Sequence, residues 1–146
     1  MQLKKAFNFL KSLPVKLNNF YAKKSKSRLV IKNKSKDKKD FDPVTNLDQD
    51  FEQHIRLLIS KKFSDDSIIG EEFSDKNSTS SYTWTIDPID GTKAFVIGAP
   101  TWSNLIGFSS QKKSLLGLVN FPELNKYYIS DKNRSYLFKN NKKYIL

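Results

Sequence analysis

Carboxylates next to turn-forming residues are the side chains of this sequence best suited to chemistry. They lie in three short segments: residues 42–48 (DPVTNLD), 70–72 (GEE) and 87–92 (DPIDGT). Taken singly, each segment has a structural explanation, because Asp-Pro and Asp-Gly form turns, Asp and Thr cap helices, and paired Glu residues usually lie on a solvated surface. Considered together, the segments predict a site built from carboxylate oxygens.

The segment that begins at Asp87 has the most specific pattern. Asp87 directly follows residues 82–86, whose alternating large side chains predict a β-strand, and Asp90 lies three residues later in a predicted turn. Both carboxylates can converge there. Mg²⁺ prefers oxygen ligands and usually retains several waters, so a few carboxylates and the backbone carbonyl of Ile89 would suffice to bind it.

The residues after Asp90 are suited to phosphate. Gly91 allows a tight turn, and Thr92 begins a predicted short helix through Phe95 whose free N–H groups suit an anion. A metal and a phosphate that meet at one point predict phosphoryl chemistry, in which the metal neutralises phosphate oxygens and lowers the pKa of a bound water. A carboxylate such as Glu71 would orient or deprotonate that water.

The composition excludes several other chemistries. The sequence has no cysteine and one histidine, which excludes a disulfide framework, a thiolate nucleophile, an iron–sulfur centre and any site that needs two imidazoles. The histidine, His54, lies beside the apolar stripe of a predicted helix, and we assign it no catalytic role. No apolar run is long enough to span a membrane or follows the N-terminal lysines as in a secretory signal, so we expect a cytoplasmic protein without a membrane partner.

The net charge of +11 is concentrated at the N-terminus. Residues 1–41 contain 13 Lys or Arg and two Asp, whereas residues 42–146 contain 13 basic and 13 acidic residues. The lysines are not interleaved with stacking aromatics, so we expect no specific nucleic-acid partner. Recruitment of a basic protein to nucleic acid or an anionic membrane through residues 1–41 is a less favoured interpretation of the function.

Two helices are predicted before the main run of strands. The first is short and amphipathic and ends at Pro14, with one or two helical turns after it. Residues 23–41 predict a solvated lysine-rich loop with one short strand at 28–31. The second helix begins at Thr45, which resembles a capping box with Asp48. The apolar stripe of this helix consists of Leu47, Phe51, Ile55 and Leu58.

Short strands are predicted beyond residue 66. Their ranges are 67–69, 82–86, 102–108, 115–121, 126–129, 136–138 and 144–146. No helix-length segment separates the later strands, so we predict an α+β fold in which an antiparallel sheet packs with helices on one side. We expect the basic segment 1–41 to belong to the same domain as the metal- and phosphate-binding part, residues 42–146.

The three acidic segments resemble those of the inositol monophosphatase family of magnesium-dependent phosphomonoesterases. Residues 42–48, 70–72 and 84–92 (WTIDPIDGT) occur in the family's order and approximate spacing. The resemblance extends over residues 42 to about 146, and the predicted first helix fits the family's first helix. It implies the N-terminal half of a layered α/β/α/β/α sandwich of the sugar-phosphatase type.

The resemblance also implies a role for each matching residue. The implied metal ligands are Glu71, Asp87, Asp90 and the carbonyl of Ile89. The implied phosphate-binding residues are Gly91 and Thr92. The implied catalytic residues, which position the attacking water or hold the groups around it from behind, are Glu71, Thr92, Asp42 and Thr45. Glu72 matches the family's second acid and would act in the outer shell or at a further metal site.

Residues 91–107 look closest to the bacterial histidinol-phosphatase branch of the family. Histidinol phosphate is therefore the leading substrate and inositol phosphate the other candidate. Members of the family continue into a second domain with a Trp-Asp-x-x-Ala-Gly motif that completes the metal site and holds the substrate. The resemblance thus implies that this chain lacks the C-terminal substrate domain, and it implies a homodimer for complete members.

We therefore expect the metal-binding domain of a magnesium-dependent phosphatase. It would hydrolyse a small phosphate monoester by a metal-activated water, without a covalent enzyme intermediate. The activity of this chain alone is expected to be low. A non-catalytic remnant that keeps the fold and residual metal binding is the alternative.

Overall fold

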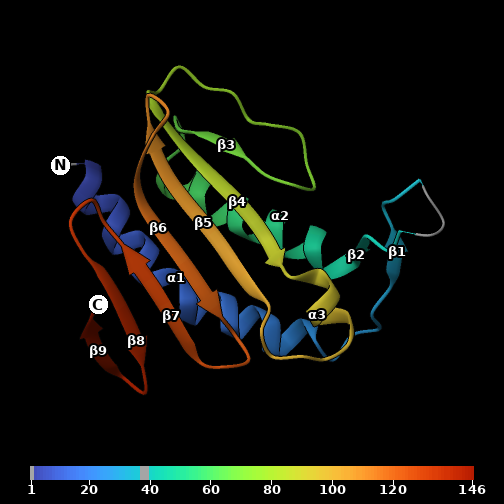
Figure 1. Cartoon of the computed structure of the whole chain (residues 1–146). Helices are drawn as coiled ribbons and strands as arrows, with labels where there is room; N and C mark the ends of the chain where they lie inside the picture. The colour runs from blue at the N-terminus through green and yellow to red at the C-terminus, as the bar shows by residue number, and fades with distance from the viewer. Residues whose placement is uncertain (1, 37–39) are drawn as a thin grey trace.

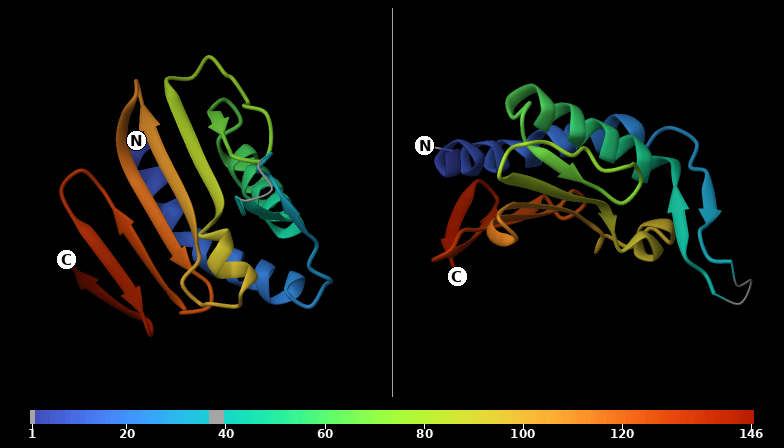
Figure 2. Two further views of the ribbon diagram at one scale, coloured as in Figure 1. Left: turned by 45° about the vertical axis from the view of Figure 1, so that its right-hand side comes forward. Right: turned by 90° about the horizontal axis from the view of Figure 1, so that it is seen from above.

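Two long helices lie side by side across one face of a seven-stranded sheet (Figure 1). The computed structural model describes residues 2–36 and 40–146. Helix α1 spans Gln2–Lys24 and packs against β6 and β7, while helix α2 spans Asn46–Lys62 and packs against β4. Figure 2, in the view from above, shows both helices on the same side of the sheet, which confirms the predicted arrangement.

The large sheet follows chain order from β3 to β9. Its strands are β3 (Ser67–Ile69), β4 (Tyr82–Asp90), β5 (Ser103–Ser110), β6 (Lys113–Phe121), β7 (Lys126–Ser130), β8 (Ser135–Lys139) and β9 (Lys142–Ile145). Every strand range predicted beyond residue 66 overlaps one of these strands. All neighbouring pairs are antiparallel except β3 and β4, which run parallel. The predicted antiparallel sheet is confirmed except at this edge, where the long connection 70–81 returns the chain to the end at which β3 began.

Smaller elements lie near the point where strand β4 ends. Strands β1 (Ile31–Asn33) and β2 (Pro43–Thr45) form an antiparallel ribbon, and helix α3 (Thr92–Val96) follows β4 directly. The strand predicted at 28–31 overlaps β1 only at its last residue. Part of the predicted lysine-rich loop, residues 37–39, lies outside the described residues.

Helix α1 continues through Pro14 without a break. The predicted end of the helix at this proline is therefore wrong. Proline removes one backbone hydrogen bond and costs about 3 kcal/mol in a helix interior, but burial of each large apolar side chain contributes about 1.5–3 kcal/mol. The buried residues of α1 on both sides of the proline are Ala6, Phe9, Leu10, Leu13 and Leu17. Burial of these side chains outweighs the cost of the proline in the helix.

Within residues 2–36 and 40–146, no helix combines the length and apolar character needed to cross a membrane.

The core lies between the two helices and the sheet. Helix α2 starts with the predicted capping box at Thr45, and the first three residues of its predicted stripe are buried. The fourth, Leu58, is only half-buried, and Ile59 is buried in the core in its place. His54 stacks on the ring of Phe20 with centroids 4.3 Å apart, which confirms its predicted position at the flank of the stripe.

We expect Pro14→Ala to raise the free energy of unfolding by about 1 kcal/mol or more, because alanine restores the missing helix hydrogen bond. Urea denaturation measures the change. Val15→Ala, one position along on an exposed face of the same helix, is the control and should shift stability by only about 0.5 kcal/mol. A loss of stability in Pro14→Ala would show that the proline ring itself is needed in the core.

Candidate metal and phosphate site

The three acidic segments meet at one cavity of about 290 Å³ beside the end of β4. The residues that line it are Asp42, Pro43, Glu71, Asp87, Ile89, Asp90, Gly91, Thr92 and Lys93. Of the site residues predicted from the sequence, Thr45 and Glu72 are not among them. The structure therefore brings together side chains from β2, the 70–81 connection, β4 and α3.

A β-bulge turns Asp87 and Asp90 toward the same side of β4. Asp87 pairs with Leu105 and Asp90 with Ser103, so the three steps along β4 face only two along β5. In a regular strand, residues three apart point to opposite faces. The extra residue of the bulge reverses this alternation, and both carboxylates reach the cavity. Strand β4 thus extends beyond its predicted end at residue 86.

Asp87 lies in an electrostatically unfavourable position. Its Oδ1 atom is buried and has no hydrogen-bond partner among the residues that the structure describes. Burial and, after it, the negative charges of Glu71 and Asp90 raise the pKa of Asp87 to about 7. Within the part of the chain that the structure describes, no three acidic or histidine side chains are already gathered closely enough to form a metal cluster. The carboxylates thus line one cavity but do not converge on a single point.

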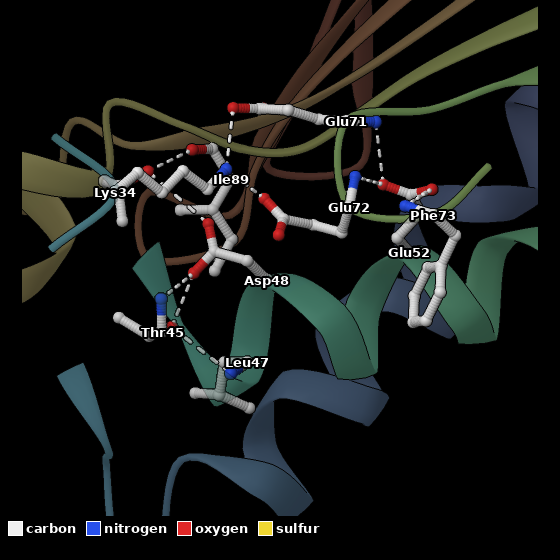
Figure 3. A network of polar contacts seen from close by, with 10 residues as sticks. Lys34, Thr45, Leu47, Asp48, Glu52, Glu71, Glu72, Phe73 and Ile89 are labelled. Carbon is white, nitrogen blue, oxygen red and sulfur yellow. Dashed lines mark hydrogen bonds and ion pairs between the residues drawn. The ribbon is translucent and has the colours of Figure 1, made fainter. Parts of the chain in front are cut away.

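Lys34 interacts with both glutamates of the GEE segment. Its Nζ lies 3.2 Å from Glu71 Oε1 and 2.5 Å from Glu72 Oε1 (Figure 3). Its backbone N–H also donates to the carbonyl of Asp42, at 2.7 Å, which fixes the lysine next to the cavity. Sequence analysis placed this residue in a solvated lysine-rich loop. Nothing in the sequence distinguishes Lys34 from the other lysines of that loop, because its partners lie 37 and 38 positions away.

The Thr92 hydroxyl contacts Asp48, which in turn contacts Thr45. The Thr92 hydroxyl lies 3.0 Å from the Ile89 carbonyl and 3.4 Å from Asp48 Oδ1. The other oxygen of Asp48 accepts hydrogen bonds from the N–H and the hydroxyl of Thr45, at 2.7 and 2.6 Å (Figure 3). Thr45 therefore reaches Thr92 through Asp48, while Asp42 lies at the cavity wall.

Burial is the main influence on the Asp48 carboxyl group and raises its pKa, although the hydrogen bonds from Thr45 act in the opposite direction. Asp48 belongs to the acidic segment 42–48, but the role predicted for it was that of a helix cap. Its second oxygen, Oδ1, lies within reach of the Thr92 hydroxyl. A capping aspartate has two acceptor oxygens, so capping leaves one free for another partner.

Glu52 holds the GEE segment in place and was missed in the sequence. Its side chain is completely buried and accepts hydrogen bonds from the backbone N–H groups of Glu71, Glu72 and Phe73, at 2.9, 2.7 and 3.3 Å. Arg56, one helical turn later, donates to it at 2.8 Å. The signal available in the sequence was the spacing of four between Asp48, Glu52 and Arg56, which places all three along one side of the helix.

The Glu52 carboxylate also explains the glycine before the glutamates. A Cβ atom at Gly70 would lie 2.0 Å from Glu52 Oε1 and 2.8 Å from a terminal nitrogen of Arg56. No side chain fits there unless the carboxylate moves. The glycine therefore provides space for a buried ion pair that orients the backbone of Glu71.

Comparison with known proteins agrees with this arrangement. The model of the inositol monophosphatase family matches residues 5–144. A histidinol-phosphatase from Chlorobaculum parvum is 41% identical over 95 residues, which cover 65% of this chain and 37% of that protein. The extragenic suppressor protein suhB from Bartonella henselae superposes with a TM-score of 0.81 at 22% identity, over 94% of this chain and 52% of that one.

A second solved structure, an IMPase/NADP phosphatase complexed with Mg²⁺ and phosphate, superposes with a TM-score of 0.79 at 18% identity. It is matched over 99% of this chain and 52% of its own. At these identities the two solved structures establish the fold. The chain spans about half the length of these structures and 37% of the curated relative.

Gly70→Ala should lower the free energy of unfolding by about 2–4 kcal/mol, because the new methyl group displaces Glu52 from its backbone donors. Urea denaturation measures this loss. Gly107→Ala is the matched control: its Cβ would meet Thr85 at an ordinary 3.7 Å, and we expect a change within about 1 kcal/mol. Equal losses in the two variants would contradict the importance of the Glu52 interaction.

Lys34→Met should raise the pKa of Glu72 further above its ordinary value. Burial already raises this pKa, and Lys34 opposes that shift through its hydrogen bond and charge. A carboxyl ¹³C NMR titration reports the change. Lys36→Met removes a nearby exposed lysine and should leave the titration of Glu72 unchanged. An unchanged pKa in Lys34→Met would mean that the ion pair does not form in solution.

Proposed function

The chain belongs to the inositol monophosphatase family, and on that premise we propose that it forms the metal- and phosphate-binding part of a magnesium-dependent phosphatase of small phosphate monoesters. The observation that carries the proposal is the buried, unpartnered Oδ1 of Asp87 in a cavity shared with Glu71 and Asp90. A buried carboxylate oxygen without a partner is costly. A divalent cation would remove that cost and the repulsion among the three carboxylates.

The groups around Asp87 fit Mg²⁺ by their chemistry. The proposed ligands are Glu71, Asp87, Asp90 and the carbonyl of Ile89, all of them oxygen donors. Support also comes from the related IMPase/NADP phosphatase, whose solved complex contains Mg²⁺ and phosphate. When bound, the metal would neutralise phosphate oxygens and lower the pKa of a coordinated water.

The residues beyond the carboxylates would orient phosphate and water. Gly91 adopts a left-handed conformation, with φ of 82°, and turns the chain from β4 into α3 so that Gly91 and Thr92 both line the cavity. We assign phosphate contact to these two residues. The Thr92 hydroxyl would accept a hydrogen bond from the attacking water while it donates to Asp48 Oδ1, and Glu71 would orient the same water.

Histidinol phosphate is the first substrate that we propose, with inositol phosphate as the other. The support is the relative from Chlorobaculum parvum, which is named a histidinol-phosphatase and matches this chain over 37% of its own length. A homodimer, implied by the family resemblance, is the proposed assembly. These assignments concern the complete protein, of which the described cavity supplies the metal and phosphate side.

A non-catalytic domain with residual metal binding is the second candidate. Lys34 favours it, because its ammonium group forms ion pairs with Glu71 and Glu72 beside the cavity without any metal. Both candidates predict metal binding, and only the first predicts hydrolysis. Release of phosphate from histidinol phosphate and inositol 1-phosphate, measured with and without Mg²⁺, distinguishes them.

Asp87→Asn should weaken Mn²⁺ or Mg²⁺ binding by about tenfold or more, because a neutral amide is a poor ligand for a hard cation. Isothermal titration calorimetry measures the affinity. Any hydrolysis should fall by about 100-fold. Asp75→Asn, at an exposed acid outside the cavity, should behave like the wild type. Equal affinities of the wild type and Asp87→Asn would overturn the metal assignment.

A further inference from the structure

Three asparagine side chains connect helix α1 to the end of strand β4. Asn120 Nδ2 donates to Asn18 Oδ1, at 3.0 Å, and to Asn104 Oδ1, at 2.9 Å. Asn104 Nδ2 in turn donates to the backbone carbonyl of Pro88, at 2.7 Å. The side chains of Asn104 and Asn120 have no exposed surface. The result is a continuous chain of amides, buried at Asn104 and Asn120 and half-buried at Asn18, with one end on the segment that contains Asp87 and Asp90.

These amides lie where the sheet otherwise presents apolar residues to the helices. Asn104 and Asn120 are direct register partners on β5 and β6. The buried residues that follow them on the same face of these strands are Ile106, Phe108, Leu116 and Leu118. Burial of an amide is unfavourable unless its hydrogen bonds are made, and Asn120 Oδ1 has no partner. Core stability alone therefore does not account for the two asparagines.

The Pro88 carbonyl explains why a donor is needed at position 104. Pro88 lies within the β4 bulge, where the regular pairing between β4 and β5 is interrupted between Asp87 and Asp90. A bulge leaves backbone groups without their usual partners on the neighbouring strand. Asn104 provides a side-chain donor in place of the missing backbone one. It thereby orients the peptide group that joins Pro88 to Ile89.

We propose that Asn104 is a positioning residue that holds the β4 bulge in the conformation that presents Asp87, Asp90 and the Ile89 carbonyl to a cation. Asn120 and Asn18 fix Asn104 from the side of helix α1. The effect on the cation rests on the proposed function, whereas the effect on the bulge does not. The network thus couples the N-terminal helix to the order of the site.

Asn104→Leu tests the proposal, because leucine has nearly the same shape but cannot donate to the Pro88 carbonyl. Hydrogen exchange of the backbone amides of residues 89–92 should accelerate by about tenfold or more, which is the effect of losing one buried hydrogen bond. Mn²⁺ affinity, measured by calorimetry, should fall by a similar factor. Exchange in β7, on the far side of the network, should remain within about twofold of the wild type.

Ile106→Val is the matched control. It removes a methyl group from the same buried face of β5 and lowers stability, but it leaves the bond between Asn104 and Pro88 intact. Hydrogen exchange at residues 89–92 and Mn²⁺ affinity should both stay within about twofold of the wild type in this variant.

Asn18→Ala, at the α1 end of the network, should give a smaller acceleration of hydrogen exchange at residues 89–92 than Asn104→Leu. It also provides the test if Asn104→Leu does not fold.

Each outcome bears on a different part of the inference. Wild-type exchange at residues 89–92 in Asn104→Leu, or equal acceleration in Ile106→Val, overturns the positioning role. Accelerated exchange with unchanged Mn²⁺ affinity overturns the link to the cation. If the wild-type chain binds no Mn²⁺, the proposed function and that link both fail, while the exchange data still decide whether Asn104 orders the bulge.

Discussion

The buried carboxylate of Glu52 is the interaction on which the candidate site depends. It binds three consecutive backbone N–H groups of the connection after β3 and is neutralised by Arg56 on its own helix. Because a buried carboxylate must be both paired and hydrogen bonded, the segment 71–73 has little freedom to lie elsewhere. This anchors the backbone of Glu71 to helix α2, next to a cavity that Asp87 and Asp90 of β4 and Asp42 also line.

Acidic side chains predominate among the charged residues that line the cavity that this anchor helps to build. The β4 bulge turns Asp87 and Asp90 to one side, and Glu71 adds a third carboxylate. Lys34 relieves part of the repulsion from outside, but its contacts are to the glutamates, and Asp87 Oδ1 stays unpaired. The fold thus holds the carboxylates near one another although their proximity lowers its stability. A bound cation would offset that loss of stability.

Helix α1 contributes to the same site from a distance. Its continuation through Pro14 places Asn18 against Asn120, the start of the amide chain that ends at the Pro88 carbonyl. The next turn places Tyr21 against Trp102, with ring centroids 4.9 Å apart, and its hydroxyl donates to Glu123. A helix that ended at the proline would provide none of these contacts. Packing of the N-terminal helix and order at the end of β4 are therefore parts of one network.

The sequence by itself determined the features that depend on neighbours along the chain. Alternation of large residues located β4, and short strand-like segments between turn formers located the other strands from β3 to β9. Apolar spacing and a capping box located α2, and three acidic segments with their turn residues identified Asp87, Asp90 and Glu71 as one site. Only the tertiary structure decided the partners of Lys34, the contact between Asp48 and Thr92, the buried Glu52, the amide chain and the parallel strand β3. The physical reason is the same in each case. These contacts join residues between 16 and 102 positions apart, and no local pattern records which distant group will satisfy a buried charge or an unpaired carbonyl. Pro14 shows the converse, since a local rule that ends helices is overruled by burial of the apolar face on either side of it.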